Sequence, residues 1–128
     1  MDWNQVQKDV GTPSENGISR AEGGRVLSFD EKTLVHELLE LSGLDSLPSG
    51  WLDSALVVEM DDGGMGSLRF ISSGGRTEAI EQVAEISFSD VDGVLVSVTL
   101  NANGQGVPAE LDVWKTNFQP LVKKLGPP

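Results

Sequence analysis

The sequence predicts an α+β domain in which one N-terminal amphipathic helix packs on a mostly antiparallel sheet of about five strands, arranged as a meander. Three observations support this fold class. They are one helical segment with clear capping residues, a series of short β-rich runs separated by glycine-containing turns, and a hairpin whose strands divide into an apolar and a polar face. The apolar faces of the helix and the sheet are expected to share one core.

The chain divides into a flexible or partly helical N-terminal segment, residues 1–26, and a single α+β domain, residues 27–128. A length of 128 residues suits one domain, which buries roughly two-thirds of the surface that its unfolded chain exposes. In the first segment Trp3, Val6 and Val10 have helical spacing, and the glycine- and serine-rich stretch after them is typical of a loop. We place no chemistry in this segment.

A helix is predicted from about residue 29 to residue 42. Ser28 and Glu31 have the spacing of a capping box, in which the serine oxygen accepts from a first-turn N–H and the glutamate reaches back. Gly43 suits the left-handed residue that ends a helix. One face carries the apolar residues Leu34, Val35, Leu38, Leu39 and Leu41. The opposite face carries Lys32, His36 and Glu40, where His36 is expected to contact Glu40 one turn away.

Five strands are predicted after this helix, at about 53–60, 65–72, 79–88, 93–101 and 106–115. The hairpin across residues 101–106 is the most informative pair. With Leu100 opposite Val107, one face is apolar throughout and contains Val94, Val96, Val98, Ala109, Leu111 and Val113. The opposite face then carries Glu110, Asp112 and Trp114. A slip of one residue would mix the two faces, so the alternation specifies the register.

The glycine-rich stretch DDGGMGSLRF, residues 61–70, is predicted to be a turn between strands. Placing Met60 opposite Met65 leaves a four-residue loop and puts Val57 across from Leu68. A phosphate-binding loop needs backbone N–H groups that face the anion, together with a lysine or a helix N-terminus. This stretch instead begins with two carboxylates and leads into a strand, so we expect no phosphate site there.

The aspartate-containing loops resemble fragments of metal sites without completing one. Asp61 with Asp62, and Asp90 with Asp92, offer oxygen ligands of the kind that hard cations prefer. Aspartate before glycine is also what a tight turn requires, and we favour that interpretation. The only histidine lies on the polar face of the helix, which makes a catalytic triad hard to build. We therefore predict no enzyme and no cofactor, with a small metal-binding or hydrolytic domain as the alternative.

The charge of the chain is the most informative functional feature. Twenty acidic residues against nine basic ones give a formal net charge of -11, which repels nucleic acid phosphates and anionic membranes. We expect a basic protein partner, although acidity for solubility alone and a homodimeric interaction module are alternatives. The candidate partner contacts are Asp61, Asp62, Asp90, Asp92, Glu110, Asp112 and Trp114. No secretion signal and no apolar run of about 20 residues is present, so a cytoplasmic location is expected.

Four stretches of the chain resemble a family of small bacterial proteins of unknown function. They are LVHELLELSGL, DDGGMGSLRF, VDGVLVSVTLN and AELDVWKTNFQPL, with DGGMGSLRF and ELDVWK the most characteristic runs. The resemblance covers about residues 26–122 and implies an independently folding domain without established catalytic residues. In size and acidity the chain is also similar to bacterial immunity proteins, including those of contact-dependent growth inhibition. That similarity implies a non-enzymatic protein that neutralises a basic toxin domain, such as a nuclease.

Overall fold

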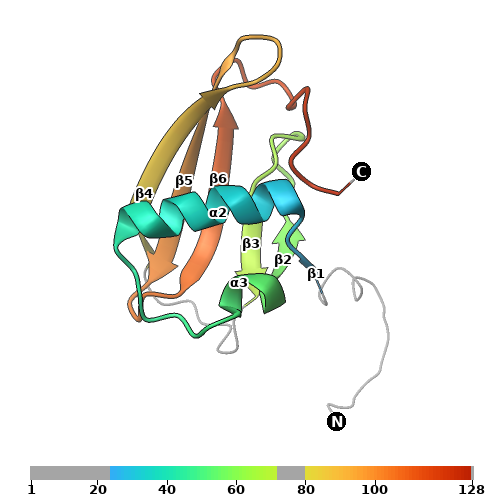
Figure 1. Cartoon of the computed structure of the whole chain (residues 1–128). Coiled ribbons are helices and arrows are strands. Elements are labelled where there is room, and N and C mark those ends of the chain that lie inside the picture. The colour runs from blue at the N-terminus through green and yellow to red at the C-terminus, as the bar shows by residue number, and fades with distance from the viewer. Residues whose placement is uncertain (1–23, 72–79, 128) are drawn as a thin grey trace.

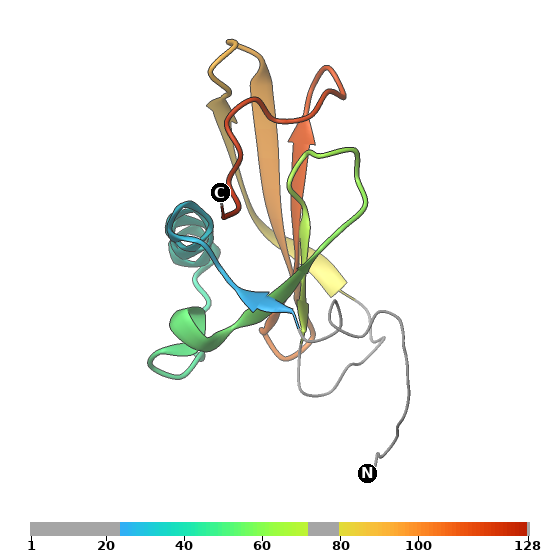
Figure 2. The ribbon, with the colours of Figure 1, turned by 90° about the vertical axis from the view of Figure 1, so that its right-hand side faces the viewer.

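The structure is a computed structural model that describes residues 24–71 and 80–127 of the chain. Along these residues the elements are β1 (Arg25–Val26), α2 (Phe29–Ser42), α3 (Trp51–Ser54), β2 (Leu56–Glu59), β3 (Leu68–Ile71), β4 (Ile80–Ser89), β5 (Leu95–Asn103) and β6 (Pro108–Lys115). They form a single antiparallel sheet with α2 lying across it (Figure 1). The helices and the end of the C-terminal segment, residues 116–127, lie on the same side of that sheet (Figure 2).

The order of the strands confirms the α+β class but not a simple meander. The six described strands run β1-β2-β3-β6-β5-β4, and every neighbouring pair is antiparallel. The last strand therefore returns between β3 and β5, where Leu111 lies opposite Leu68 and both side chains are buried. Arg25 and Val26, which the sequence assigned to the N-terminal segment, pair with β2. The turn expected around Trp3, Val6 and Val10 lies outside the described residues.

The predicted helix is confirmed from Phe29 to Ser42, together with both of its ends. The Ser28 side chain accepts from the Glu31 N–H at 3.1 Å, and the Glu31 carboxylate accepts from the Ser28 N–H at 2.9 Å. Gly43 adopts the left-handed conformation, with φ of 76°, that ends the helix. His36 Nε2 lies 3.3 Å from the Glu40 carboxylate, as the helical spacing predicts.

Both hairpin registers differ from the predicted ones by an even number of residues. Val98 lies opposite Val113 rather than Ala109, and Val57 lies opposite Phe70 rather than Leu68. In the β5–β6 hairpin the turn forms later than predicted, because the Asn103 side chain accepts from the N–H groups two and four residues onward. The even slip keeps Leu111 and Val113 on their predicted face. Beyond a bulge between Asn101 and Ala102, however, Pro108 is buried in place of the predicted Ala109.

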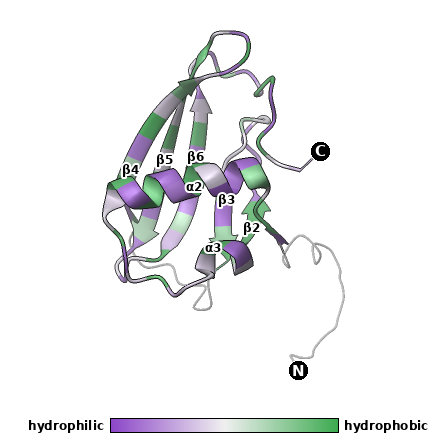
Figure 3. Cartoon of the chain, viewed as in Figure 1, coloured by the Kyte–Doolittle hydropathy of each residue, from purple (hydrophilic) through white to green (hydrophobic). Residues whose placement is uncertain are grey.

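The core lies between α2 and the sheet. Hydrophobic and hydrophilic residues alternate along β5 and β6 (Figure 3), and the hydrophobic set faces the helix. The helix contributes Leu34, Val35 and Leu38, and the C-terminal segment contributes Leu121. The strands contribute Val57, Leu68, Phe70, Ala84, Val96, Val98, Leu100, Leu111 and Val113. Burial of these side chains supplies the main favourable term in folding.

Replacing Leu38 tests how much of the stability comes from the helix–sheet contact. The side chain is completely buried, so Leu38→Ala should lower the free energy of unfolding by about 2–5 kcal/mol through lost burial and the cavity left behind. Urea denaturation followed by circular dichroism measures this loss. His36→Ala, on the exposed face of the same helix, should stay within about 0.5 kcal/mol of the parent chain. Equal losses in the two variants would contradict the assigned orientation of α2.

Candidate functional site

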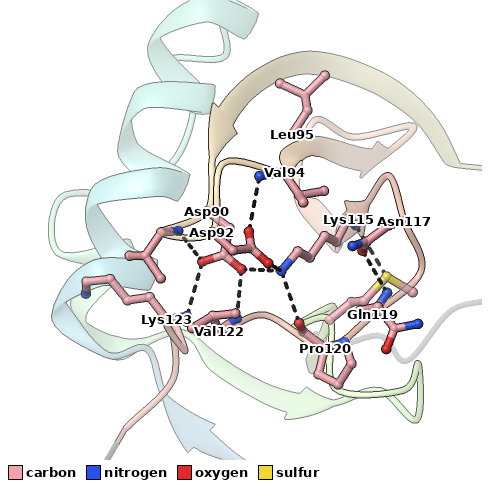
Figure 4. A network of polar contacts seen from close by, with 12 residues as sticks. Asp90, Asp92, Val94, Leu95, Lys115, Asn117, Gln119, Pro120, Val122 and Lys123 are labelled. Atoms are coloured by element: carbon pink, nitrogen blue, oxygen red, sulfur yellow. Dashed lines mark hydrogen bonds and ion pairs between the residues drawn. The ribbon is translucent and has the colours of Figure 1, made fainter.

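Lys115 forms a buried ion cluster with two of the predicted contact residues (Figure 4). Its side chain is about 1% exposed, and Nζ lies 2.8 Å from Asp90 Oδ2 and 2.7 Å from Asp92 Oδ2. The Pro120 carbonyl, at 3.4 Å, accepts the third hydrogen bond from the ammonium group. All three donors of the lysine are therefore satisfied inside the protein. The expectation that Asp90 is displayed to a partner is not met, because its side chain is buried, whereas the Asp92 side chain pairs with the lysine and remains 37% exposed.

Asp90 also fastens the C-terminal segment to the turn between β4 and β5. Its carboxylate accepts from the N–H groups of Val122 at 2.7 Å, Lys123 at 3.2 Å and Val91 at 2.8 Å. With the lysine, four donors thus converge on one buried carboxylate. The turn, the end of β6 and the C-terminal segment are consequently joined through a single side chain.

The charges in this cluster favour one another's ionised forms. The Lys115 ammonium group and three backbone N–H donors lower the pKa of Asp90 well below its usual range, against the opposing effect of burial. Lys115 likewise lowers the pKa of Asp92, whose carboxylate also accepts from the Val94 N–H. Burial alone would lower the pKa of Lys115, but hydrogen bonds from its ammonium group to the two carboxylates raise it. In this cluster one lysine therefore pairs with two aspartates, and all three groups are charged at neutral pH.

The alternation of residues along β6 predicts that Lys115 is buried, although lysine is usually an exposed residue. Lys115 follows Leu111 and Val113 at intervals of two, so alternation alone places it on the buried face of β6. A lysine at such a position requires a carboxylate partner. The nearest chain reversal with two aspartates is the turn after β4.

Asp61 and Asp62, the two aspartates of the loop between β2 and β3, differ in their surroundings. Asp62 is half-buried, and its carboxylate accepts from the N–H groups of Met65 at 3.1 Å and Ser67 at 2.9 Å. Burial opposes ionisation of Asp62, but hydrogen bonds from Ser67 and neighbouring backbone N–H groups lower its pKa. Asp62 therefore closes the turn, as predicted for this stretch, whereas the neighbouring Asp61 is exposed.

Glu110, Asp112 and Trp114 lie together on the sheet face opposite α2. Here this surface is called the open face, and its residues are Arg69, Glu85, Ser87, Ser97, Thr99, Asn101, Glu110, Asp112 and Trp114. The register arranges them in rows across the strands: Ser87–Ser97–Trp114, then Glu85–Thr99–Asp112, then Asn101–Glu110–Arg69. Asp112 accepts a hydrogen bond of 2.8 Å from the Asn101 side chain, which holds its carboxylate in place. The predicted grouping of these three residues is confirmed.

An aromatic pair marks one end of the open face. The Trp114 side chain is 46% exposed, and its ring centroid lies 5.8 Å from that of Phe118, which is 68% exposed. Phe118 adopts a φ of 63°, a left-handed conformation that costs a non-glycine residue about 1–3 kcal/mol. Leu95, also exposed, pairs with Ser89 on the neighbouring strand. An apolar patch of three exposed side chains therefore adjoins the carboxylates of the open face.

A second ion cluster, around Arg25, was not predicted. The Arg25 guanidinium group donates to both oxygens of the buried Glu31 carboxylate, at 2.8 and 3.0 Å, and to Glu59 at 2.9 Å. These two glutamates raise the pKa of Arg25, against burial. A cavity of about 260 Å³ lies beside the cluster and is bounded by Lys124 and Leu125 of the C-terminal segment. The cluster ties β1, β2 and the start of α2 together.

A further cavity is lined by uncharged residues of the described chain. It measures about 700 Å³ and lies between α3, the ends of β2 and β3, and the β5–β6 turn. Its lining includes Trp51 and Phe70, whose ring centroids are 5.6 Å apart, and none of the described residues that line it is charged. Elsewhere in residues 24–71 and 80–127, no three His, Asp or Glu side chains are grouped so that they could hold a metal ion. Over the same residues, neither helix has the length and apolar character needed to cross a membrane.

The fold and the site together define a small acidic α+β domain with one polar sheet face and no recognisable catalytic arrangement in its described part. Residues 24–125 match the family model described as a domain of unknown function (DUF6984), so the chain belongs to this family. No curated protein and no solved structure matches the chain. Membership agrees with the expectation of a small domain of unknown function that covers most of the chain.

Removing the buried lysine should be far more damaging than removing an exposed one. Lys115→Met leaves two carboxylates close together without their cation, one of them buried, so a large loss of stability is expected. Lys123→Met removes an exposed lysine that pairs with Asp30 at 3.4 Å and should change stability little. Urea denaturation midpoints compare the two variants directly. Similar midpoints would show that the lysine cluster does not hold the fold together.

The pKa shift of Asp90 predicts how stability depends on pH. Because the pKa is lower in the folded chain than its ordinary value of about 4, the contribution of Asp90 is fully present above that value. It is lost progressively as the pH falls below about 4 and the carboxylate becomes protonated. Asp90→Asn should therefore reduce the fall in the urea midpoint between about pH 5 and pH 2. Asp61→Asn changes an exposed loop carboxylate and should keep the parent slope; a parent-like slope in Asp90→Asn would contradict the assignment.

Proposed function

We propose that this chain is a non-enzymatic binding protein whose open face docks on a basic protein. In its most specific form, it is a cytoplasmic immunity protein that neutralises a basic toxin domain, such as a nuclease, in the manner of contact-dependent growth inhibition. The observation that carries the proposal is the row of carboxylates beside an exposed tryptophan on the open face. Such a combination supports recognition of a cationic surface, because carboxylates attract it and an aromatic side chain anchors it.

The distribution of the acidic residues supports the open face over the loops. Asp62, Asp90 and Asp92 are committed to internal hydrogen bonds or ion pairs, so their displacement by a partner would weaken the fold. Glu85 on β4 and Glu110 and Asp112 on β6 instead project from the open face of one rigid sheet, and the hydrogen bonds of Glu85 and Asp112 are to side chains of that same face. Rigid display reduces the side-chain ordering that binding must otherwise impose. Arg69 lies at the far end of the face, opposite Glu110, and leaves the end nearer Trp114 the more acidic one.

Neutralisation would follow from competition for the partner's basic surface. A nuclease binds nucleic acid phosphates through lysine and arginine side chains, and the carboxylates of the open face offer those side chains an alternative. An arginine that reaches Asp112 can also stack on the indole of Trp114, since a guanidinium group is attracted to the face of an aromatic ring. The net charge of -11 would accelerate encounter with such a partner and make it depend on salt.

Charge reversal on the open face tests the proposal. The probe is a basic toxin domain encoded beside this chain, and its association rate is measured by stopped-flow fluorescence. The double variant Glu110→Lys/Asp112→Lys should slow association by about tenfold or more, because it replaces attraction with repulsion at the contact. Co-expression with the toxin domain should then no longer protect bacterial growth.

A matched variant separates the local surface from overall charge. Glu40→Lys/Asp45→Lys changes the net charge by the same amount, but at exposed positions on and after α2. It should associate faster than the open-face variant, and thermal melting should show that both variants are folded. Equal association rates for the two variants would exclude the open face as the docking surface. A parent chain that fails to protect growth against every basic toxin domain encoded beside it would overturn the immunity function.

A further inference from the structure

The outer edge of β4 has the features of a site for strand addition. β4 is the last strand of the sheet, and none of the elements described in residues 24–71 and 80–127 pairs with its outer side. A bulge between Gln82 and Ala84 interrupts its first half. From Ala84 to Ser89 the ladder with β5 is regular, and Glu85 is the only charged residue in that stretch. An edge of this length is normally protected by charges, a proline or a covering loop.

The hydrogen-bond pattern shows which backbone groups this edge presents. The Asp90 N–H donates to the Val94 carbonyl at 2.9 Å, so Asp90 and every second residue before it direct their backbone groups toward β5. Glu85, Ser87 and Ser89 therefore direct their N–H and C=O groups outward. The side chains of Glu85 and Ser87 lie on the open face, where these residues are paired with Thr99 and Ser97, and Ser89 is paired with Leu95 on the same side of the sheet.

A groove of about 420 Å³ runs between α2 and this edge. Six consecutive residues, 86–91, line it, and the first four of them belong to β4. Since successive strand residues point to opposite faces, a wall made of consecutive residues is formed by the strand backbone itself. The floor is apolar, with Leu34, Phe88 and Leu125 among its residues, and the helix adds the exposed acids Asp30 and Glu37. Lys123 pairs with Asp30 at 3.4 Å, which leaves the groove acidic on balance.

We propose that an extended segment of a partner, with alternating basic and apolar residues, pairs with the outer edge of β4. Its backbone would bond to Ser87 and the outward groups on either side. Its apolar side chains would enter the groove beside Ile86 and Phe88, and its basic side chains would lie next to Glu85 on the open face. This inference rests on the proposed function for the basic character of the partner, while adding a site and a binding mode. A second copy of the chain is disfavoured as the occupant, because each copy carries a net charge of -11.

The experiment uses a synthetic peptide in place of the partner. The probe is a capped peptide of about six alternating arginine and valine residues, a length that matches the regular edge. A peptide of the same composition with the arginines and valines in two blocks is its control. Titration of the full chain, followed by amide chemical shifts, should move the signals of Glu85, Ser87 and Ser89 with the alternating peptide. The block peptide should move them much less.

Two substitutions at one position separate backbone pairing from charge attraction. Ser87→Pro removes an outward N–H without removing a ladder bond to β5, so the edge is blocked while the sheet is retained. It should raise the dissociation constant of the alternating peptide about tenfold, whereas Ser87→Thr, which keeps the N–H, should not. Amide signals of β5 report whether the sheet is intact in Ser87→Pro.

Several results would overturn the inference. One is an unchanged affinity in a folded Ser87→Pro variant, and another is the absence of any β4 shift at about 1 mM peptide, the weak end of specific binding. Shifts at Glu110, Asp112 and Trp114 without shifts along β4 would also overturn it, while supporting the open face alone. Concentration-dependent β4 shifts without peptide would assign the edge to a second copy instead. Because Ser87→Pro leaves Glu110 and Asp112 unchanged, strand addition and open-face docking fail in separate measurements.

Discussion

The buried ammonium group of Lys115 imposes the constraint on which much of this structure depends. A charge without solvent is very costly unless it is paired and fully hydrogen-bonded, so the chain must bring carboxylates to the end of β6. Asp90 and Asp92 arrive there from the turn after β4, on the far side of β5. The pairing can form only when all three strands are in register and the C-terminal segment covers the cluster. One ion cluster therefore couples the order of the strands to the course of the chain after them.

The C-terminal segment is consequently held by several polar contacts along its course. Asp90 accepts from the N–H groups of Val122 and Lys123, and the Ser28 hydroxyl at the start of α2 donates to the Leu125 carbonyl. Leu121 comes just before these contacts; its side chain is buried in the core and its N–H donates to the Gly64 carbonyl at 3.1 Å. The segment has no helix or strand, yet its fixed course completes the covered side of the sheet. Its polar contacts thus connect the lysine cluster with the capped end of the helix.

Local patterns predicted the elements of this fold, but pairing between distant segments was harder to predict. The capping box of α2 and, as far as the bulge after Asn101, the two faces of the β5–β6 hairpin follow from residue spacing and were confirmed. The hairpin registers were wrong by even steps, because alternation determines the face of a residue but not its exact partner. The position of β6 beside β3 depends on which buried faces meet, and no local pattern encodes that. The sequence places Asp90 in a loop and so predicts a partner contact, but it does not indicate the lysine partner that lies 25 residues away.

The pairing of Lys115 with Asp90 and Asp92 also determines which acidic residues remain without an internal cation. The carboxylate of Asp90 pairs with Lys115, and that of Asp62 accepts backbone hydrogen bonds within its turn. Both groups therefore stabilise the fold. The carboxylates of the open face lie on the side of the sheet opposite α2, where the described chain places a single arginine, Arg69. The open face carries Glu85, Glu110 and Asp112 against Arg69, so the side chains of this face are acidic on balance. A rigid sheet that keeps its structural aspartates on the covered side can change the open face without disturbing the core. Such a separation supports the proposal that the open face docks on a basic partner.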